Sequence, residues 1–172
     1  MKTMSLLFAV LLFATSTIAC TAINEQQQSE QLLTQNDSIV QTAVGDSIFA
    51  IIVNAKSITA EIVGYTDSTK EKTPEVKLSA DDIKILKFLL MNPQNVSSND
   101  TVFGKVLPNI CFTFKSKNKI CQLLFDFGLK KWQILDADFN ILKTFDLKSS
   151  EFVHLASRLF PNDEYLNLLL NQ

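Results

Sequence analysis

The sequence predicts an α+β fold in which an antiparallel four-strand meander sheet is packed with two main helices. Four short apolar segments follow one another between residues 109 and 147, and the breaks between them are too short for crossover connections. Two segments of helical periodicity flank them, Leu78–Pro93 and Ser149–Pro161. The chain of 172 residues is 47% hydrophobic, which is enough for one domain with a packed core.

The first residues have the order of a secretory signal peptide. Lys2 supplies a positive start, and Leu6–Ala14 is an apolar run that is too short to span a bilayer as a helix. Small and polar residues follow. We therefore expect residues 1–19 to be a signal peptide that is removed from the mature chain.

The end of this segment indicates how the chain is held in place. Thr17-Ile18-Ala19-Cys20 resembles a bacterial lipobox, with Thr17 where Leu is usual. The resemblance implies that Cys20 is lipidated and becomes the first mature residue. Acyl chains on one cysteine suffice for anchoring, because each buried CH₂ contributes about 0.8 kcal/mol. Cleavage after Ala22 is the alternative, and it would release a soluble secreted protein.

Residues 20–44 are rich in Gln, Ser, Thr and Asn, and they predict a flexible tether between Cys20 and the domain. Short Asp-Ser or Asp-Thr tripeptides recur in the chain and resemble the O-glycosylation acceptors of Bacteroides-type envelope proteins. That resemblance implies four possible O-glycosylation sites, Ser38, Ser47, Ser68 and Thr101. Asp-Ser and Asp-Thr are also ordinary turn and cap pairs, and this second interpretation stays open.

Residues 45–172 are expected to form a single α+β domain. Its first segment, Asp46–Lys56, is interpreted as a short helix capped by Asp46 or Ser47, with a strand as the alternative. A strand over Ser57–Tyr65 and a polar loop over Thr66–Lys77 are predicted to follow. In the next helix Ser79 is the expected N-cap, with Asp82 completing a capping box. Apolar residues cover most of that helix, so it is predicted to be nearly buried.

The meander strands are predicted at Asn109–Lys115, Lys119–Phe127, Lys131–Asp136 and Asn140–Leu147. If their Phe, Ile, Leu and Trp side chains share one face, paired residue numbers in the first hairpin must have an odd sum. Cys111 and Cys121 then lie on opposite faces and cannot form a disulfide, unless a bulge shifts the register. A short helix capped by Asn162 is expected to end the chain.

Several function classes lack support. With Lys+Arg 16 against Asp+Glu 18, the chain has no electrostatic footprint for nucleic acid. The low count of four glycines argues against a phosphate-cradling loop. Asp126-Phe127-Gly128 and the Asp136–Asn140 stretch match parts of kinase and calcium motifs, but each is better explained as a turn between strands. His154 is the single histidine, and its helical position predicts a solvated side chain.

We therefore expect no catalytic residue, no metal, no cofactor and no enzymatic activity. The C-terminal pattern "PNICFTF…ICQLLFDFG…KWQILD…FDL…LASRLFPND" resembles small lipoproteins of Bacteroides-type bacterial envelopes, from Leu78 to the C-terminus. The resemblance implies a protein of the bacterial cell envelope, lipid-anchored in the outer membrane. The predicted tether, the compact domain and the lack of a recognisable catalytic motif favour a binding or assembly module with an unknown protein partner. The thirteen Phe residues leave open an alternative, a pocket that binds an apolar ligand.

Overall fold

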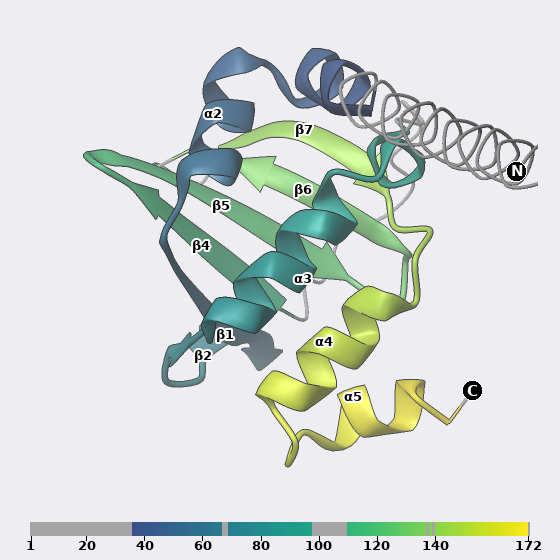
Figure 1. Ribbon diagram of the computed structural model, residues 1–172. Coiled ribbons are helices and arrows are strands. Elements are labelled where there is room, and N and C mark those ends of the chain that lie inside the picture. The colour runs from purple at the N-terminus through teal and green to yellow at the C-terminus, as the bar shows by residue number, and fades with distance from the viewer. Residues whose placement is uncertain (1–35, 67–68, 98–109, 137, 139, 172) are drawn as a thin grey trace, which may run out of the picture. The chain divides into compact units, whose positions relative to one another are not determined.

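Figure 1 shows a computed structural model of the chain, which describes residues 36–66, 69–97, 110–136, 138 and 140–171. The chain divides into two compact units between Ser38 and Ile39. The second unit contains every strand and the labelled helices, and it is α+β as predicted.

All neighbouring strands of the sheet are antiparallel, in the order β2-β1-β4-β5-β6-β7. The short strand β3 also pairs with β1, along the same edge of β1 as β2. The sheet therefore contains seven strands but is six strands wide. The strands are β1 Ser57–Thr66, β2 Thr69–Lys72, β3 Val76–Lys77, β4 Ile110–Ser116, β5 Lys119–Asp126, β6 Lys131–Leu135 and β7 Ile141–Asp146.

The helices α2, α3 and α4 lie over one face of this sheet (Figure 1). The described helices are residues 36–44, α2 Asp46–Asn54, α3 Ala80–Leu90, the 3₁₀ helix η1 Pro93–Val96, α4 Glu151–Leu159 and α5 Glu164–Leu169. Beneath them the sheet presents a continuous apolar layer, in which cross-strand partners share the face: Ile58, Phe114 and Cys121; Phe112, Leu123 and Ile134; Phe125, Trp132 and Phe145.

An aromatic cluster forms the centre of this core. Phe125 packs edge-on against Phe112 at 5.5 Å between ring centroids and stacks on Trp132 at 5.8 Å. Phe152 of α4 lies 4.9 Å from Phe125, and Phe145 lies 4.5 Å from Trp132. These aromatic side chains fill one another's space, as core packing requires.

The predicted meander is confirmed as β4 to β7, but the prediction of four strands and two main helices is incomplete. The segment expected to be a polar loop instead forms β2 and β3 on the outer edge of β1. Backbone pairing holds it there: Thr73 N–H donates to Ile62 O at 3.1 Å, and Leu78 N–H donates to Ile58 O at 3.0 Å. A strand at a sheet edge needs backbone partners more than an apolar face, so polar side chains are compatible with it.

The capping box of α3 is present, with Asp82 N–H donating to Ser79 Oγ at 3.1 Å. The prediction that this helix is nearly buried is wrong, because Phe88 is 75% exposed and Ile85 is 38% exposed. Only the side that carries Leu86, Leu89 and Leu90 is buried against the core. The side-chain hydrogen bond from Ser79 is the largest cause of the lowered pKa of Asp82. Arg158 of α4 also forms an ion pair with that carboxylate and lowers its pKa further.

Two boundaries differ from those expected. Residues 36–44, predicted as the end of the tether, are helical, and Val40 and Val44 are buried in the core. Two valines four residues apart give the helix a narrow apolar stripe that the polar composition around them obscured. At the other end, Asp163 rather than Asn162 caps α5, because its Oδ1 accepts from Leu166 N–H at 2.8 Å.

The predicted register of the first hairpin is confirmed. Phe112 pairs with Leu123, Cys111 with Leu124 and Cys121 with Phe114. The two cysteines therefore lie on opposite faces of the sheet, and both are buried thiols. Burial raises the pKa of the Cys121 thiol to about 12.

Candidate functional site

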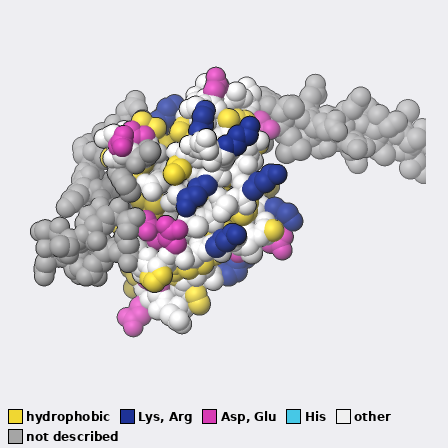
Figure 2. All heavy atoms as spheres, turned by 90° about the vertical axis from the view of Figure 1, so that its left-hand side faces the viewer, with side chains coloured by type: hydrophobic (Ala, Val, Ile, Leu, Met, Phe, Trp, Pro, Cys, Tyr) yellow, Lys and Arg dark blue, Asp and Glu magenta, His cyan; other side chains and the backbone are white. Residues whose placement is uncertain are grey.

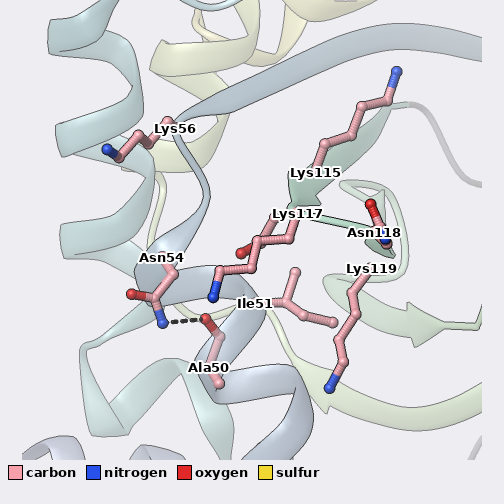
Figure 3. Close-up of a pocket in the computed structure, with 9 residues that line it drawn as sticks. Ala50, Ile51, Asn54, Lys56, Lys115, Lys117, Asn118 and Lys119 are labelled. Atoms are coloured by element: carbon pink, nitrogen blue, oxygen red, sulfur yellow. Dashed lines mark hydrogen bonds between the residues drawn. The ribbon is translucent and has the colours of Figure 1, made fainter.

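A groove of about 780 Å³ opens between the C-terminal end of α2 and the turn that joins β4 to β5 (Figure 3). Four of its nine lining residues are lysines, and none is acidic. The lining residues are Ala50, Ile51, Asn54, Lys56, Lys115, Ser116, Lys117, Asn118 and Lys119. We call this feature the lysine groove.

The hairpin turn places three of the lysines. Ser116 pairs with Lys119, so Lys117 and Asn118 alone make the turn. Lys117 has a φ of 53°, in the left-handed region that residues with a Cβ seldom adopt. In Figure 3, Lys117 extends toward Asn54, and Lys119 runs along the other side of Ile51. Two cationic side chains therefore flank one apolar side chain on the wall formed by α2.

The other two lysines extend the charge outward. Lys56 follows α2 and Lys115 precedes the turn, and both point away from Ile51 in Figure 3. Lys56 lies next to Ser57, which pairs with Lys115 across β1 and β4. The register of the sheet thus brings together residues that are nearly sixty positions apart in the sequence.

A fifth lysine fixes the wall of the groove formed by α2. The Lys87 ammonium of α3 donates to Val53 O at 2.6 Å and to Ala55 O at 2.7 Å. Burial lowers the pKa of Lys87, yet the two carbonyls supply partners for its charge. Asn54 Nδ2 donates to Ala50 O at 2.8 Å, which orders the last turn further. The wall is thus held in place before any ligand arrives.

The side chains of the four lining lysines make no ion pair and no hydrogen bond within the part of the chain that the structure describes. Ion pairs occur elsewhere in that part, between Lys84 and Asp81, Lys131 and Asp146, and Arg158 and Asp82. Figure 2 shows lysine and arginine side chains gathered over the face of the molecule that lies on the left in Figure 1. A local excess of positive charge therefore exists on a chain whose formal net charge is −2.

The residues singled out in the sequence do not converge on this groove. Cys20, Ser68 and Thr101 lie outside the described residues. Ser38 and Ser47 are exposed, and both lie within helices. The groove was not predicted from the sequence. The five residues around the hairpin turn, "KSKNK", include three lysines, and they were a signal for it.

The two stretches that match parts of kinase and calcium motifs form turns between strands. Asp136 Oδ1 accepts from the N–H groups of Asp138 and Asn140, both at 2.9 Å, and this closes the turn before β7. Asp126 Oδ1 accepts from Leu129 N–H at 2.8 Å. His154 is exposed on α4, as predicted.

Other candidate features are weaker. A second cavity of about 350 Å³ lies near the end of α4 and is lined in part by Leu159, Phe160 and Pro161. In the described ranges no three His, Cys, Asp or Glu residues are grouped so as to hold a metal ion. Within the same ranges, no helix combines the length and the apolar character needed to cross a membrane.

Comparison of the chain with protein-family models, with curated proteins and with solved structures finds no match.

Proposed function

We propose that this chain is a lipid-anchored protein of the bacterial cell envelope and that its α+β domain is a non-enzymatic binding module for an anionic ligand. The observation that carries the proposal is the lysine groove, where four lysines and no carboxylate line one concave surface. Cys20 is the proposed lipid attachment site, supported by the sequence of residues 17–20.

The chemistry of the lining favours binding over catalysis. Its nine residues include no His, Cys, Asp or Glu, the side chains that most often act as nucleophiles or as acids and bases near neutral pH. An ammonium group is a compact point charge with three donors, and it suits phosphate or carboxylate oxygens. The groove therefore selects a ligand by charge, and its lysines and Ser116 have no His, Asp or Glu beside them in the lining to act as an acid–base partner.

The dipole of helix α2 does not by itself explain why four lysines line the groove. Cations near the C-terminal end of a helix are stabilising by about 0.3–1 kcal/mol, because the carbonyls there are unpaired. Here Lys87 already donates to two of those carbonyls. Lys56 and Lys115 point away from the helix. The dipole can therefore account for Lys117 at most, and the remaining positive charge needs another reason.

The test is a calorimetric titration of the purified full chain with inorganic hexametaphosphate, a soluble polyanion. The groove variant is Lys115→Gln with Lys119→Gln, and the control is Lys130→Gln with Lys148→Gln. Lys130 and Lys148 are exposed and lie near the opposite end of β5 from the turn. Both variants remove two positive charges.

We expect the groove variant to bind up to about 25-fold more weakly, since each of the two lysines contributes up to about 1 kcal/mol, or about fivefold in affinity. The control should stay within about twofold of the unmodified chain. Equal losses in the two variants would show that only net charge matters, and absence of binding would refute the proposed ligand class.

The anchor is tested separately by intact-mass measurement of the protein purified from the envelope. An added acyl mass on a chain that begins at Cys20 supports the proposal. A mature chain that begins at Ile23 and carries no acyl group contradicts it.

A further inference from the structure

We infer that the lysine groove and its rim form a membrane-docking face, and that the lipid-anchored domain lies on an anionic bilayer with lipid phosphates at the lysines. The inference rests on the proposed function, because it names the anionic partner of the same site. It adds a second attachment to the acyl group on Cys20.

Two exposed apolar side chains lie on the elements that carry the lysines, outside the lining of the groove itself. Ile120 is 47% exposed and pairs with Lys115 across the hairpin, so these two side chains share the face of the sheet opposite that of Lys119. Val53 is 45% exposed and precedes Asn54 at the end of α2. Single exposed apolar residues are common on proteins. Apolar side chains near the edge of a cluster of cations are a feature of surfaces that insert shallowly among lipid headgroups.

The lining also argues against a soluble glycan or nucleotide as the main ligand. None of the nine residues is aromatic, so the groove offers no ring on which a sugar or base would stack. A lipid phosphate needs only the ammonium groups. The alkyl stems of Lys117 and Lys119, which flank Ile51 in Figure 3, suit the apolar boundary below the headgroups.

The anchor makes a weak attraction sufficient. One lysine near an anionic leaflet contributes about a fivefold preference for the docked state. Once Cys20 is held in the bilayer, docking of the domain is intramolecular, so no high intrinsic affinity is needed. Lysines 56, 115, 117 and 119 together would then keep the domain mostly on the surface at low salt.

The experiment uses the acylated protein purified from the envelope and placed in lipid nanodiscs. Asn118→Cys, at the tip of the hairpin, carries a fluorophore, and the bilayer contains a headgroup quencher. The matched control is Ser150→Cys, an exposed position with no side-chain cap bond. Cys111 and Cys121 are buried, so the label goes to the introduced thiol.

We expect strong quenching at position 118 when about one-third of the lipid is phosphatidylglycerol, and little quenching in neutral phosphatidylcholine. Quenching at position 150 should be weak in both. Lys115→Gln with Lys119→Gln should lower the docked-to-undocked ratio about 25-fold, or fivefold for each lysine. Salt at about 0.5 M should release the domain, because it screens the attraction.

The outcomes separate the two proposals. If hexametaphosphate binds in the groove but position 118 is not quenched, membrane docking is overturned and the proposed function stands. Equal quenching in neutral and anionic bilayers, or quenching unchanged in the lysine variant, also overturns docking. If neither hexametaphosphate nor the anionic bilayer is recognised, both proposals fail together.

Discussion

Lys117 and Lys130 share a left-handed backbone conformation, and comparing them tests why a lysine occupies the turn between β4 and β5. Lys117 has a φ of 53° and Lys130 a φ of 52°, and both are exposed residues of turns between strands. A left-handed conformation costs a residue with a Cβ about 1–2 kcal/mol. Glycine avoids that cost but has about 0.5–1 kcal/mol more conformational freedom to lose on folding. Lys117→Gly and Lys130→Gly should each raise the free energy of unfolding by about 0.5–1 kcal/mol.

The two substitutions should differ only in binding. Lys117 lines the groove, and Lys130 lies at the other end of β5. Removing the Lys117 ammonium should cost about 1 kcal/mol of binding, or about fivefold in affinity for hexametaphosphate. Lys130→Gly should bind as the unmodified chain does. The stabilised Lys117→Gly protein would then be the weaker binder, and this combination cannot arise from misfolding.

Urea unfolding and the calorimetric titration together decide the matter. A Lys117→Gly chain that gains stability and keeps its full affinity refutes the reasoning, because the lysine would then have no role at the groove. If Lys117→Gly loses stability while Lys130→Gly gains it, the turn at β4–β5 needs the lysine for folding, and the strain argument is wrong there.

Two more predictions concern residues that support the site and the core. Burial raises the pKa of Cys121 to about 12 from an ordinary 9.0, so the folded chain keeps this proton while the unfolded chain releases it above pH 9. Stability therefore falls as pH rises from 9 toward 12, and between pH 8 and 10 the unmodified chain should lose about 1.4 kcal/mol more in urea unfolding than Cys121→Ala; equal losses would show that the thiol is not the cause. Lys87→Met keeps the apolar stem but removes the two bonds to α2, so it should lower the free energy of unfolding by about 1–2 kcal/mol and weaken hexametaphosphate binding. Lys84→Met, at an exposed position of the same helix, is its control, and matching results from the two in urea unfolding and titration would contradict the role given to Lys87.

The meander could be predicted from the sequence because two local signals agree there. Side chains alternate in character along each strand, and the connections are too short for anything but antiparallel neighbours. The same alternation predicted that Cys111 and Cys121 lie on opposite faces, which the pairing of Phe112 with Leu123 confirms. Whether paired residue numbers have an odd or an even sum can be worked out without knowledge of the rest of the fold.

The edge strands could not be found in this way. β2 and β3 are held by backbone hydrogen bonds to β1, and a polar sequence hides such pairing. The exposure of Phe88 was missed for the opposite reason. An apolar composition around most of a helix suggests burial, but the helix lies on the sheet with one side only, and the chain leaves Phe88 and Ile85 outward. Composition indicates which residues can be buried, whereas topology decides which are.

The groove depends on a boundary that periodicity alone does not locate. Lys119 and Cys121 lie two residues apart on β5 and therefore point to the same face of the sheet. Cys121 is fully buried under the helices, whereas Lys119 is exposed. The apolar layer thus ends between these two residues, at the level where α2 also ends. A lysine suits this position because its stem continues the apolar surface along Ile51 while its ammonium reaches solvent. Because the charges begin where the core stops, substitutions from residue 115 to 119 should alter binding while leaving the packing around Phe125 intact.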